Sequence, residues 1–492
     1  MIIKSEQNEI QDYLKDASNT KGYCDAVVYP ENTKDIINFL QEANKKKIKV
    51  TICGNRTGLT GASVPLGGIV LSTERMNKIL EINITEKFAV VEPGVLLSDF
   101  LKELKPKNLY YPPDPTELNC FIGGTVATNA SGSKTFKYGP TRDFILGIEL
   151  VLPTGETLKL KRGENFAQKN KLVLKTDSGK TYELNLPEMK TIQTKNAAGY
   201  FCNENMDAID LFIGSEGTLG IITKIKLRLL PQPEDMISCV LYFDDETVAL
   251  NFLEDARDTS YQNRKSREDI QINALALEFF DERALKFLAK DFSAIPVNAK
   301  AAVWFEQECT ADTFDSILEA WNNLMSAHNV NEETSWFAFS DIDKEKIKDF
   351  RHAISWKVNE YVTRNNFRKL GTDVAVPDKY FREFYFALQS WAKQCNIDFV
   401  TYGHFGNSHI HLNFLPKNDA EFNESKNLYI NICKEAVRLG GTISAEHGIG
   451  KNKTALLQEM YGEKAIEEMF TIKKTLDPNL ILGYGNIFAA TT

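Results

Sequence analysis

The chain of 492 residues is too long for one compact hydrophobic core, so we expect at least two domains. Its composition, 43% hydrophobic and 25% charged, is that of an ordinary globular protein, and no apolar run reaches the roughly 18 residues of a membrane span. The formal net charge of −9 argues against a nucleic-acid-binding surface, which needs an excess of lysine and arginine. We therefore expect a cytoplasmic protein with no integral membrane segment and no nucleic-acid partner.

The cysteines carry little functional information. There are 8 of them, scattered along the chain, and no two stand in a Cys-x-x-Cys pair. Neither an iron–sulfur cluster nor a cysteine-based zinc site is indicated, and we expect a reducing compartment.

The first predicted unit is a strand, a helix and a second strand. Short β-branched runs at 25–29 and 48–53 flank residues 33–46, whose apolar positions have helical spacing, with Asn32 or Thr33 as N-cap. Further strand-like runs stand at 69–71, 88–92, 147–152 and 219–229.

A change in composition follows Leu230-Pro-Gln-Pro-Glu234, where two prolines end a strand and stiffen the connection. Beyond it, helical patterns run over 313–328, 344–364 and 379–395, and all 6 histidines lie in this half. We therefore expect a first domain over 1–232 and a second over 233–492.

Three segments of the first half are rich in glycine: 54–61, 123–139 and 214–220. Glycine lets backbone amides approach a ligand closely, which suits a pyrophosphate, although each segment alone is more typical of a tight turn. Neither the G-x-G-x-x-G fingerprint nor a P-loop motif occurs in them, so a Rossmann NAD site or a P-loop is not predicted.

The run from Tyr111 to Glu156, which includes PPDPTELNCFIGGTVATNASG, closely resembles the FAD-binding domain of the vanillyl-alcohol oxidase and p-cresol methylhydroxylase (PCMH) flavoproteins. Within that superfamily the chain resembles the D-lactate, glycolate and D-2-hydroxyglutarate dehydrogenases. The resemblance is strongest at 50–156, 211–222, 371–377, 401–414 and 442–453. It implies an α+β fold, in which a two-subdomain PCMH-type FAD-binding domain precedes an α+β substrate (cap) domain and a C-terminal helical segment that returns to the flavin.

The resemblance also assigns residues to the flavin. The FAD pyrophosphate would be wrapped by Gly54, Asn55, Arg56, Thr57, Gly58, Leu59 and Gly61. The rest of the cofactor would be lined by Pro113, Asp114, Thr116, Gly123, Gly124, Asn129 and Ser131, and its adenine and ribose end by Glu216, Gly217 and Ile222. Asn486, in a closing turn, would reach the isoalloxazine ring. Many members tether the flavin through a histidine of the first glycine loop, but the first histidine here is His328, so we predict non-covalent FAD.

Four of the 6 histidines lie in two short stretches, 402–413 and 444–450. His409 and His411 alternate on a strand-like run and so point to one face, and His404 precedes a glycine turn. Histidine and carboxylate together suit a divalent metal such as Zn, Mn, Fe or Co. The composition alone also allows a hydrogen-bonded histidine patch without metal.

The resemblance makes His404, His411 and Glu446 the metal ligands, with zinc as the first choice, and makes His447 the general base. Asn413 would hydrogen-bond the substrate or support the metal. Relatives commonly read Gly-Asp-Gly-Asn-Leu-His where this chain reads Gly-Asn-Ser-His-Ile-His, so His409 is an additional histidine. We interpret it as a second-layer donor or a solvated strand residue rather than a fourth ligand.

A 2-hydroxy acid carries a carboxylate, and the resemblance makes Arg351 the candidate clamp, because the family has an arginine and a hydroxyl residue where this chain has Arg351 and, one turn later on the same helix face, Ser355. A surface arginine is the alternative. Members that act on D-2-hydroxyglutarate have a lysine two residues before Asp373, where this chain has Gly371. The missing lysine puts a substrate with a second carboxylate in doubt. The nearest basic residue is Lys369.

These observations predict FAD-dependent oxidation of a small 2-hydroxy acid, D-lactate-like or glycolate-like, to the 2-oxo acid. The hydride would pass to flavin N5, with a histidine base and a divalent metal orienting the substrate. We expect an unidentified electron acceptor, and a homodimer is possible. The alternatives are a non-redox flavin enzyme similar to alkylglycerone-phosphate synthase and a flavin-containing electron-transfer subunit.

Overall fold

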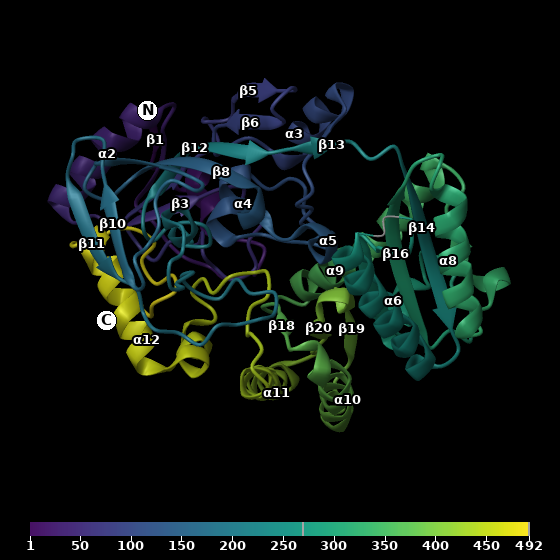
Figure 1. The fold of residues 1–492 in the computed structure, drawn as a ribbon. Helices are drawn as coiled ribbons and strands as arrows, with labels where there is room; N and C mark the ends of the chain where they lie inside the picture. The colour runs from purple at the N-terminus through teal and green to yellow at the C-terminus, as the bar shows by residue number, and fades with distance from the viewer. Residues whose placement is uncertain (268–269, 491–492) are drawn as a thin grey trace. The chain divides into compact units, whose positions relative to one another are not determined.

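The computed structural model describes residues 1–267 and 270–490. The chain forms two compact units, each described below by itself (Figure 1). Unit 1 comprises residues 1–131, 140–231 and 443–492, and unit 2 comprises residues 132–139 and 232–442. The chain therefore leaves unit 1 twice, for the short segment 132–139 and again after Pro231, and it re-enters unit 1 at Ile443.

One sheet of unit 1 contains the predicted strand–helix–strand element. Its strand order is β1 (Ile2–Lys4), β2 (Ala26–Tyr29), β4 (Ile69–Ser72), β3 (Val50–Cys53), and β4 runs parallel to both β2 and β3. The intervening helix α2 (Thr33–Lys46) begins where the Asn32 side chain accepts a hydrogen bond of 3.0 Å from the Asp35 amide. Ile36 and Leu40 of this helix are buried in the core of the unit.

The second sheet of unit 1 is antiparallel and has five strands. Their order is β5 (Ile79–Asn83), β6 (Phe88–Val91), β12 (Ile221–Arg228), β8 (Ile145–Val151) and β9 (Thr157–Lys161). The remaining elements of the unit are α1 (Gln7–Ile10), α3 (Leu97–Leu104), β7 (Leu109–Tyr110), α4 (Ile122–Thr128), β10 (Lys171–Lys175), β11 (Thr181–Asn185), β13 (Leu230–Pro231) and α12 (Thr454–Leu476). The predicted strands of the first half are confirmed.

Unit 2 is built on one sheet of seven strands. The strand order is β17 (Trp336–Phe337), β14 (Asp235–Phe243), β16 (Ala301–Cys309), β15 (Ala276–Asp281), β19 (Phe399–Gly403), β20 (His409–Phe414) and β18 (Val374–Ala375). The helices of the unit are α5 (Thr135–Tyr138), α6 (Glu246–Ser266), α7 (Glu282–Leu288), α8 (Phe314–Ala327), α9 (Asp341–Arg364), α10 (Asp378–Gln394) and α11 (Asp419–Arg438).

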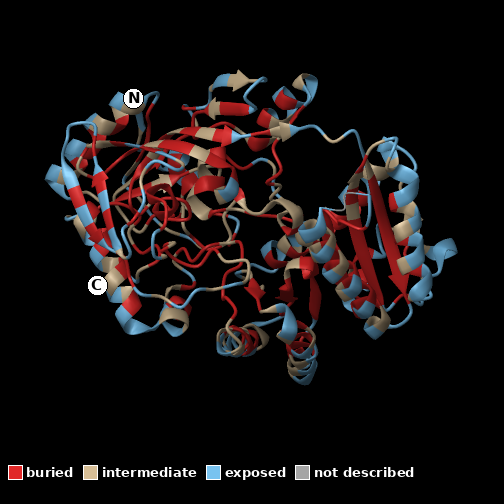
Figure 2. Ribbon diagram, in the orientation of Figure 1, coloured by how far each residue is buried: buried red, intermediate tan, exposed pale blue. Residues whose placement is uncertain are grey.

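Both faces of the unit 2 sheet are covered by helices. On β16, Phe305 stacks on Trp321 of α8, with ring centroids 3.8 Å apart, whereas the next residue toward the N-terminus, Trp304, packs in the cluster of α7 and α9. Because neighbouring strand residues point to opposite faces, helices must lie on both sides of the sheet. All positions of β15 and β20 are accordingly buried, and the neighbouring strands β14 and β16 are buried over most of their length (Figure 2).

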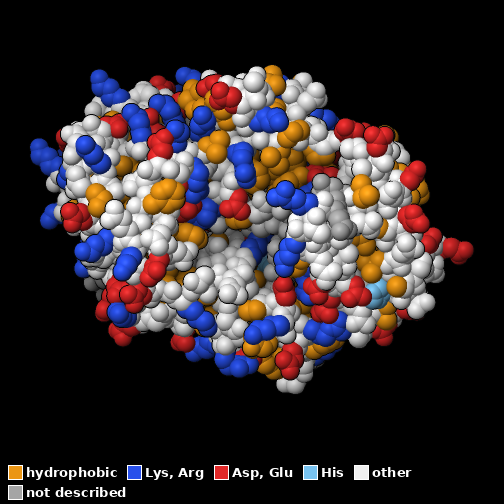
Figure 3. Space-filling view, in the orientation of Figure 1, with side chains coloured by type: hydrophobic (Ala, Val, Ile, Leu, Met, Phe, Trp, Pro, Cys, Tyr) orange, Lys and Arg blue, Asp and Glu red, His pale blue; other side chains and the backbone are white. Residues whose placement is uncertain are grey.

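The predicted helices of the second half are confirmed, with one shifted boundary. Helix α9 begins at Asp341 rather than at residue 344, because the Ser340 hydroxyl accepts a hydrogen bond of 3.2 Å from the Asp343 amide and caps the helix. Among the described residues, no helix combines the length and apolarity needed to cross a bilayer. The molecular face in Figure 3 carries acidic and basic side chains interspersed.

Candidate functional site

The hairpin of β19 and β20 positions three of the clustered histidines. A short 3-10 turn, Phe405–Asn407, joins the strands, and Ser408 takes the left-handed conformation with φ of 52°. A Cβ at Gly403 would lie only 2.5 Å from the His409 carbonyl oxygen, so the strands approach closely there only because residue 403 is glycine. The turn brings His404 back over β20, which carries His409 and His411.

The three imidazole rings form one buried cluster. One potential ligand nitrogen of each ring lies within 4.8 Å of one on each of the other two. The ring centroids are 4.3 Å apart for His409 and His411, and 5.3 and 5.5 Å from His404 to these two. His409 is 0% exposed, so the interpretation of this residue as a solvated strand position is wrong.

An oxygen acceptor holds each ring of the cluster. His404 Nδ1 lies 2.6 Å from Glu278 Oε1, His409 Nε2 lies 3.0 Å from Asp373 Oδ1, and His411 Nδ1 lies 3.0 Å from the Thr372 carbonyl. Glu278 and Asp373 were not identified from the sequence as members of the site. The sequence feature that could have identified Glu278 is the position of its carboxylate inside the otherwise apolar run Ala276–Phe280.

Arg351 is buried and reaches the histidine cluster through Glu278. Its Nε and Nη2 atoms lie 3.2 and 3.0 Å from Glu278 Oε2, and the arginine is only 7% exposed, so the alternative of a surface arginine is wrong. Arg351 Nη2 also lies 3.3 Å from His404 Nδ1. The shorter contact of that nitrogen with Glu278 indicates that it carries a proton and donates to the carboxylate. Glu278 therefore links the guanidinium and the imidazole.

Asn413 presents a buried amide without a hydrogen-bond partner. Neither its Nδ2 nor its Oδ1 atom is satisfied by any residue in the described parts of the chain, and the residue is 1% exposed. Leaving such a group unpaired costs about 1–3 kcal/mol, which is typical of positions that meet a ligand. Asn413 shares its strand face with His409 and His411, because alternate residues of a strand point the same way.

Gly371 faces Asn413 at the edge of this region. The two residues form an antiparallel bridge, and a Cβ at Gly371 would lie 2.2 Å from Asn413 Oδ1. No side chain therefore fits at position 371 while Asn413 keeps its place. Lys369 approaches the same point, with its Cε 3.5 Å from that Cβ position.

A substitution of Lys369 tests whether the protein environment destabilises its charged form. Burial lowers its pKa to about 8, although nearby Asp373 opposes this shift. An unfolded lysine has a pKa near 10.4, so below pH 8 the folded protein bears the full cost of the partly buried ammonium, and above about pH 10.4 it bears none. Lys369→Met should therefore raise stability by roughly 1–3 kcal/mol at pH 7. The gain should vanish toward pH 10.5 in thermal unfolding curves. The exposed Lys379→Met is the control, and a gain independent of pH would contradict the assignment.

In unit 1, three distant segments meet at the first glycine loop. Lys451 Nζ donates to the carbonyls of Gly61 and Ala62 at 3.2 and 3.3 Å and to Asn486 Oδ1 at 2.6 Å. Asn486 Nδ2 in turn donates to the Ala62 and Glu216 carbonyls at 2.9 and 3.1 Å. Lys451 was not identified from the sequence, because only the fold brings residues 451 and 61 together.

The Glu216 carboxylate joins the third glycine segment to this network. It accepts hydrogen bonds of 2.7 and 2.6 Å from the amides of Ile449 and Gly450. Burial raises its pKa to about 7, against the opposite effect of these two amide donors. Glu216 therefore holds the loop at 449–450 in place.

The second glycine segment begins within helix α4 of unit 1. Gly124, in its first turn, has no atom within 4 Å of a Cβ position, so there is space beside the backbone. Asn129 ends the helix in the left-handed conformation and accepts a hydrogen bond of 2.9 Å from the Arg142 amide. The remaining predicted flavin residues of unit 1 lie in or beside the three glycine segments and the loop after β7: Gly54, Asn55, Arg56, Thr57, Gly58, Leu59, Pro113, Asp114, Thr116, Gly123, Gly217 and, in β12, Ile222.

Glu446 and His447 belong to the part of the chain that returns to unit 1. Ser131 Oγ donates to Glu446 Oε1 at 3.2 Å, and Lys195 forms a buried ion pair with the same carboxylate. Glu446 is therefore already paired with a cation, and an ionised carboxylate of this kind could also bind a metal ion. The His447 carbonyl accepts a hydrogen bond of 3.3 Å from the Thr60 hydroxyl.

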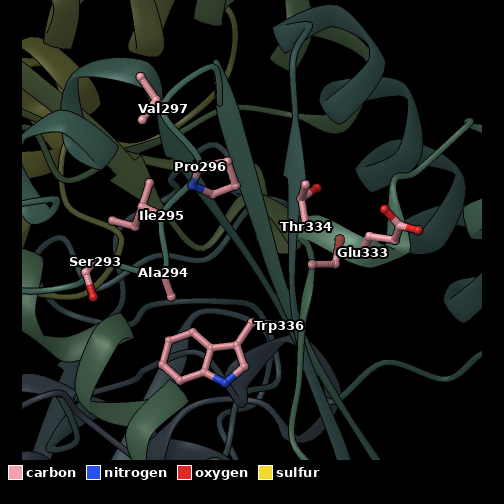
Figure 4. Close-up of a pocket in the computed structure, with 9 residues that line it drawn as sticks. Ser293, Ala294, Ile295, Pro296, Val297, Glu333, Thr334 and Trp336 are labelled. Carbon is pink, nitrogen blue, oxygen red and sulfur yellow. The ribbon is translucent and has the colours of Figure 1, made fainter.

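A pocket in unit 2 is lined by residues 293–297 and 333–336 (Figure 4). Glu333 is the single ionisable side chain among these lining residues, and none of the predicted site residues belongs to the pocket. Its lining offers neither a histidine nor a cation for a carboxylate substrate. The chemistry of unit 2 is therefore concentrated around the histidine cluster.

Two family models match the chain. A model of an FAD binding domain matches residues 24–161, and a model of the C-terminal domain of FAD linked oxidases matches residues 244–487.

Three curated relatives are similar over almost the whole chain. A D-lactate dehydrogenase of Anaerostipes hadrus is 30% identical, over 99% of this chain and 94% of its own length. The glycolate oxidase subunit GlcD of Bacillus subtilis is 28% identical, over 94% and 89%, respectively. A D-2-hydroxyglutarate dehydrogenase of Stutzerimonas stutzeri is 28% identical, over 94% and 91%.

Solved structures show the same fold at low sequence identity. p-Cresol methylhydroxylase with substrate bound has a TM-score of 0.72 at 14% identity, covering 99% of this chain and 94% of that chain. An alkyldihydroxyacetonephosphate synthase has a TM-score of 0.66 at 17% identity, covering 98% and 81%. The expected α+β architecture of the PCMH type is confirmed.

Proposed function

Because this chain belongs to the family of FAD-linked dehydrogenases that oxidise 2-hydroxy acids, we propose that its substrate is a small 2-hydroxy monocarboxylic acid, D-lactate-like or glycolate-like. The observation that carries the choice of a short substrate is the contact at Gly371. Glycine offers no cation for a second carboxylate, and a lysine there would place its Cβ 2.2 Å from Asn413 Oδ1 unless the Asn413 side chain moved.

We propose that the glycine segments of unit 1 hold FAD without a covalent bond. The space beside Gly124 and the backbone-lined loop at 54–61 suit a pyrophosphate, and residues 1–327 contain no histidine that could form a tether. When bound, FAD supplies the acceptor for the hydride that leaves the substrate's α-carbon.

Acid precipitation tests how the flavin is attached. We expect the precipitated protein to be colourless and the yellow FAD to remain in the supernatant, because no covalent bond retains it. Absorbance of the two fractions near ~450 nm is the measurement. A yellow pellet after washing would contradict non-covalent binding and would direct attention to the buried thiol of Cys120.

We propose a divalent metal site, zinc foremost and Mn, Fe or Co otherwise, with His404 and His411 as ligands. In both rings Nδ1 donates to an oxygen of the protein, at 2.6 Å to Glu278 and 3.0 Å to the Thr372 carbonyl, so Nε2 carries the lone pair. These rings therefore have the chemistry of metal ligands. A bound dication would lower the pKa of the substrate hydroxyl and fix its orientation. Glu446 as the third ligand follows from the family resemblance.

Side chains of the protein would bind the substrate and remove its hydroxyl proton. Arg351 would bind the substrate carboxylate while Glu278 limits how far its guanidinium can move. The buried amide of Asn413 would hydrogen-bond the substrate or support the metal. His447, by resemblance, would remove the hydroxyl proton as the α-hydrogen departs. An unidentified carrier or partner protein would then reoxidise the flavin.

Anaerobic reduction tests the proposal directly. The purified holoprotein is mixed without oxygen with D- or L-lactate, glycolate or D-2-hydroxyglutarate, with and without EDTA treatment. We expect a short 2-hydroxy acid to bleach the flavin band near ~450 nm and expect EDTA to abolish this bleaching until zinc is restored. Bleaching by D-2-hydroxyglutarate alone would contradict the substrate proposal and would favour Lys369 as a cation for a second carboxylate. Bleaching that EDTA leaves unchanged would contradict the metal.

A further inference from the structure

We propose that His409 is an additional imidazole ligand of the metal site and that Asp373 holds its ring in the binding orientation. The inference rests on the metal of the proposed function and deepens it, because the resemblance assigns only His404 and His411 of unit 2 to that metal. It makes this part of the site a cluster of three imidazoles.

The positions of the three rings support this inference. One nitrogen from each of His404, His409 and His411 lies within 4.8 Å of one from each of the others, so the three rings lie around one common point where an ion could bind. His409 and His411 stand two residues apart on β20 and therefore share a face, and their ring centroids are 4.3 Å apart.

The hydrogen bond to Asp373 selects the proton position on His409. A carboxylate accepts and does not donate when ionised, so Nε2 carries the hydrogen and donates across 3.0 Å to Asp373 Oδ1. In the neutral imidazole, Nδ1 then has the lone pair that a metal requires. A carboxylate behind a ligating histidine also raises the basicity of the ring and fixes its orientation.

In all three rings one nitrogen donates a hydrogen bond to an oxygen of the protein, and only the acceptor differs. Glu278 is the acceptor for His404, the Thr372 carbonyl for His411, and Asp373 for His409. A carbonyl oxygen can only accept, so the donor assignment at His411 needs no assumption about ionisation. Since His409 is 0% exposed and Asp373 is likewise 0% exposed, this arrangement is part of the core and not a chance surface pair.

A third imidazole has a consequence for metal choice. Imidazole nitrogen suits Zn, Co, Ni and Cu, whereas Mn and Mg prefer oxygen ligands. His409 should therefore increase the preference of the site for zinc over manganese. His409→Gln should weaken zinc binding more than manganese binding.

The test measures metal binding and geometry, not turnover. Full-length holoprotein is stripped with a chelator and titrated with Zn²⁺ and with Mn²⁺, as wild type, His409→Gln, Asp373→Asn and His328→Gln. Glutamine keeps an amide donor for Asp373 while removing the ring. His328 is the matched control, because its Nε2 also pairs with an aspartate, Asp255, at 2.9 Å, outside the cluster. X-ray absorption at the zinc edge counts the imidazoles bound to zinc in the wild-type protein. This part of the test therefore remains valid even if a variant fails to fold.

We expect about one tightly bound zinc per chain with three imidazoles in its shell, and a dissociation constant raised roughly 100-fold or more by His409→Gln and about 10–100-fold by Asp373→Asn. His328→Gln should change nothing. Zinc bound with two imidazoles, and bound equally well by His409→Gln, would overturn this inference and leave the proposed metal site standing. A wild-type protein that binds no metal would overturn both, while the flavin reduction by hydroxy acids would still be judged separately.

Discussion

Arg351→Met is expected to lower the free energy of unfolding by about 3–5 kcal/mol, because the change leaves the Glu278 carboxylate buried without its guanidinium. Glu278 is 2% exposed and both arginine contacts, at 3.2 and 3.0 Å, go to its Oε2 atom. Urea unfolding followed by circular dichroism measures the loss. Arg364→Met is the matched control on the same helix, since its pair with Glu360 lies on the surface and such pairs contribute about 0–1 kcal/mol.

A double variant separates the structural role of Arg351 from its role in binding. Arg351→Met with Glu278→Gln removes both charges, and the glutamine oxygen can still accept from His404, so most of the lost stability should return. Oxidation of the hydroxy acid should remain impaired, roughly 100-fold in kcat/KM, because the substrate carboxylate still lacks its partner. A stable double variant with normal kcat/KM would show that Arg351 serves the fold alone.

His447→Gln is expected to slow flavin reduction by about 10²–10⁴-fold, the usual contribution of a positioned general base. The bond from the Thr60 hydroxyl goes to the His447 carbonyl, which the substitution retains, so the local backbone should be preserved. Anaerobic stopped-flow absorbance measures the rate, and the flavin spectrum and melting temperature should stay unchanged. The pH dependence of the remaining rate should also lose the basic group seen in the wild type.

His328→Gln serves again as the control for the loss of a histidine, because His328 pairs with Asp255 and belongs to no predicted site. Unchanged flavin reduction in His447→Gln would contradict the assignment of the base, and an equal slowing in both variants would show that the effect is not specific to His447.

Local patterns in the sequence determined most of the elements. The helix at 33–46 was predicted with its bounds, because its apolar spacing and the Asn32 cap act within a few residues. The hairpin strand with alternating His409 and His411 was visible for the same reason, since strand periodicity is local. The start of α9 at Asp341 was missed, although the capping serine stands directly before it. The FAD assignment came from long motifs that resemble a known family.

Only the tertiary structure decided which side chains become neighbours. Glu278 meets Arg351 and His404 across 73 and 126 residues, and Lys451 meets Gly61 across 390. The return of residues 443–492 to unit 1 likewise depends on packing that no local pattern records. His409 shows most clearly what the sequence leaves undecided. Its alternation with His411 predicted that both side chains share one face of the strand. Its burial, which excludes a solvated role, depends on helices covering both sides of the sheet. Sequence spacing specifies local backbone geometry, whereas contacts between distant segments follow from how the apolar faces of all elements are buried together.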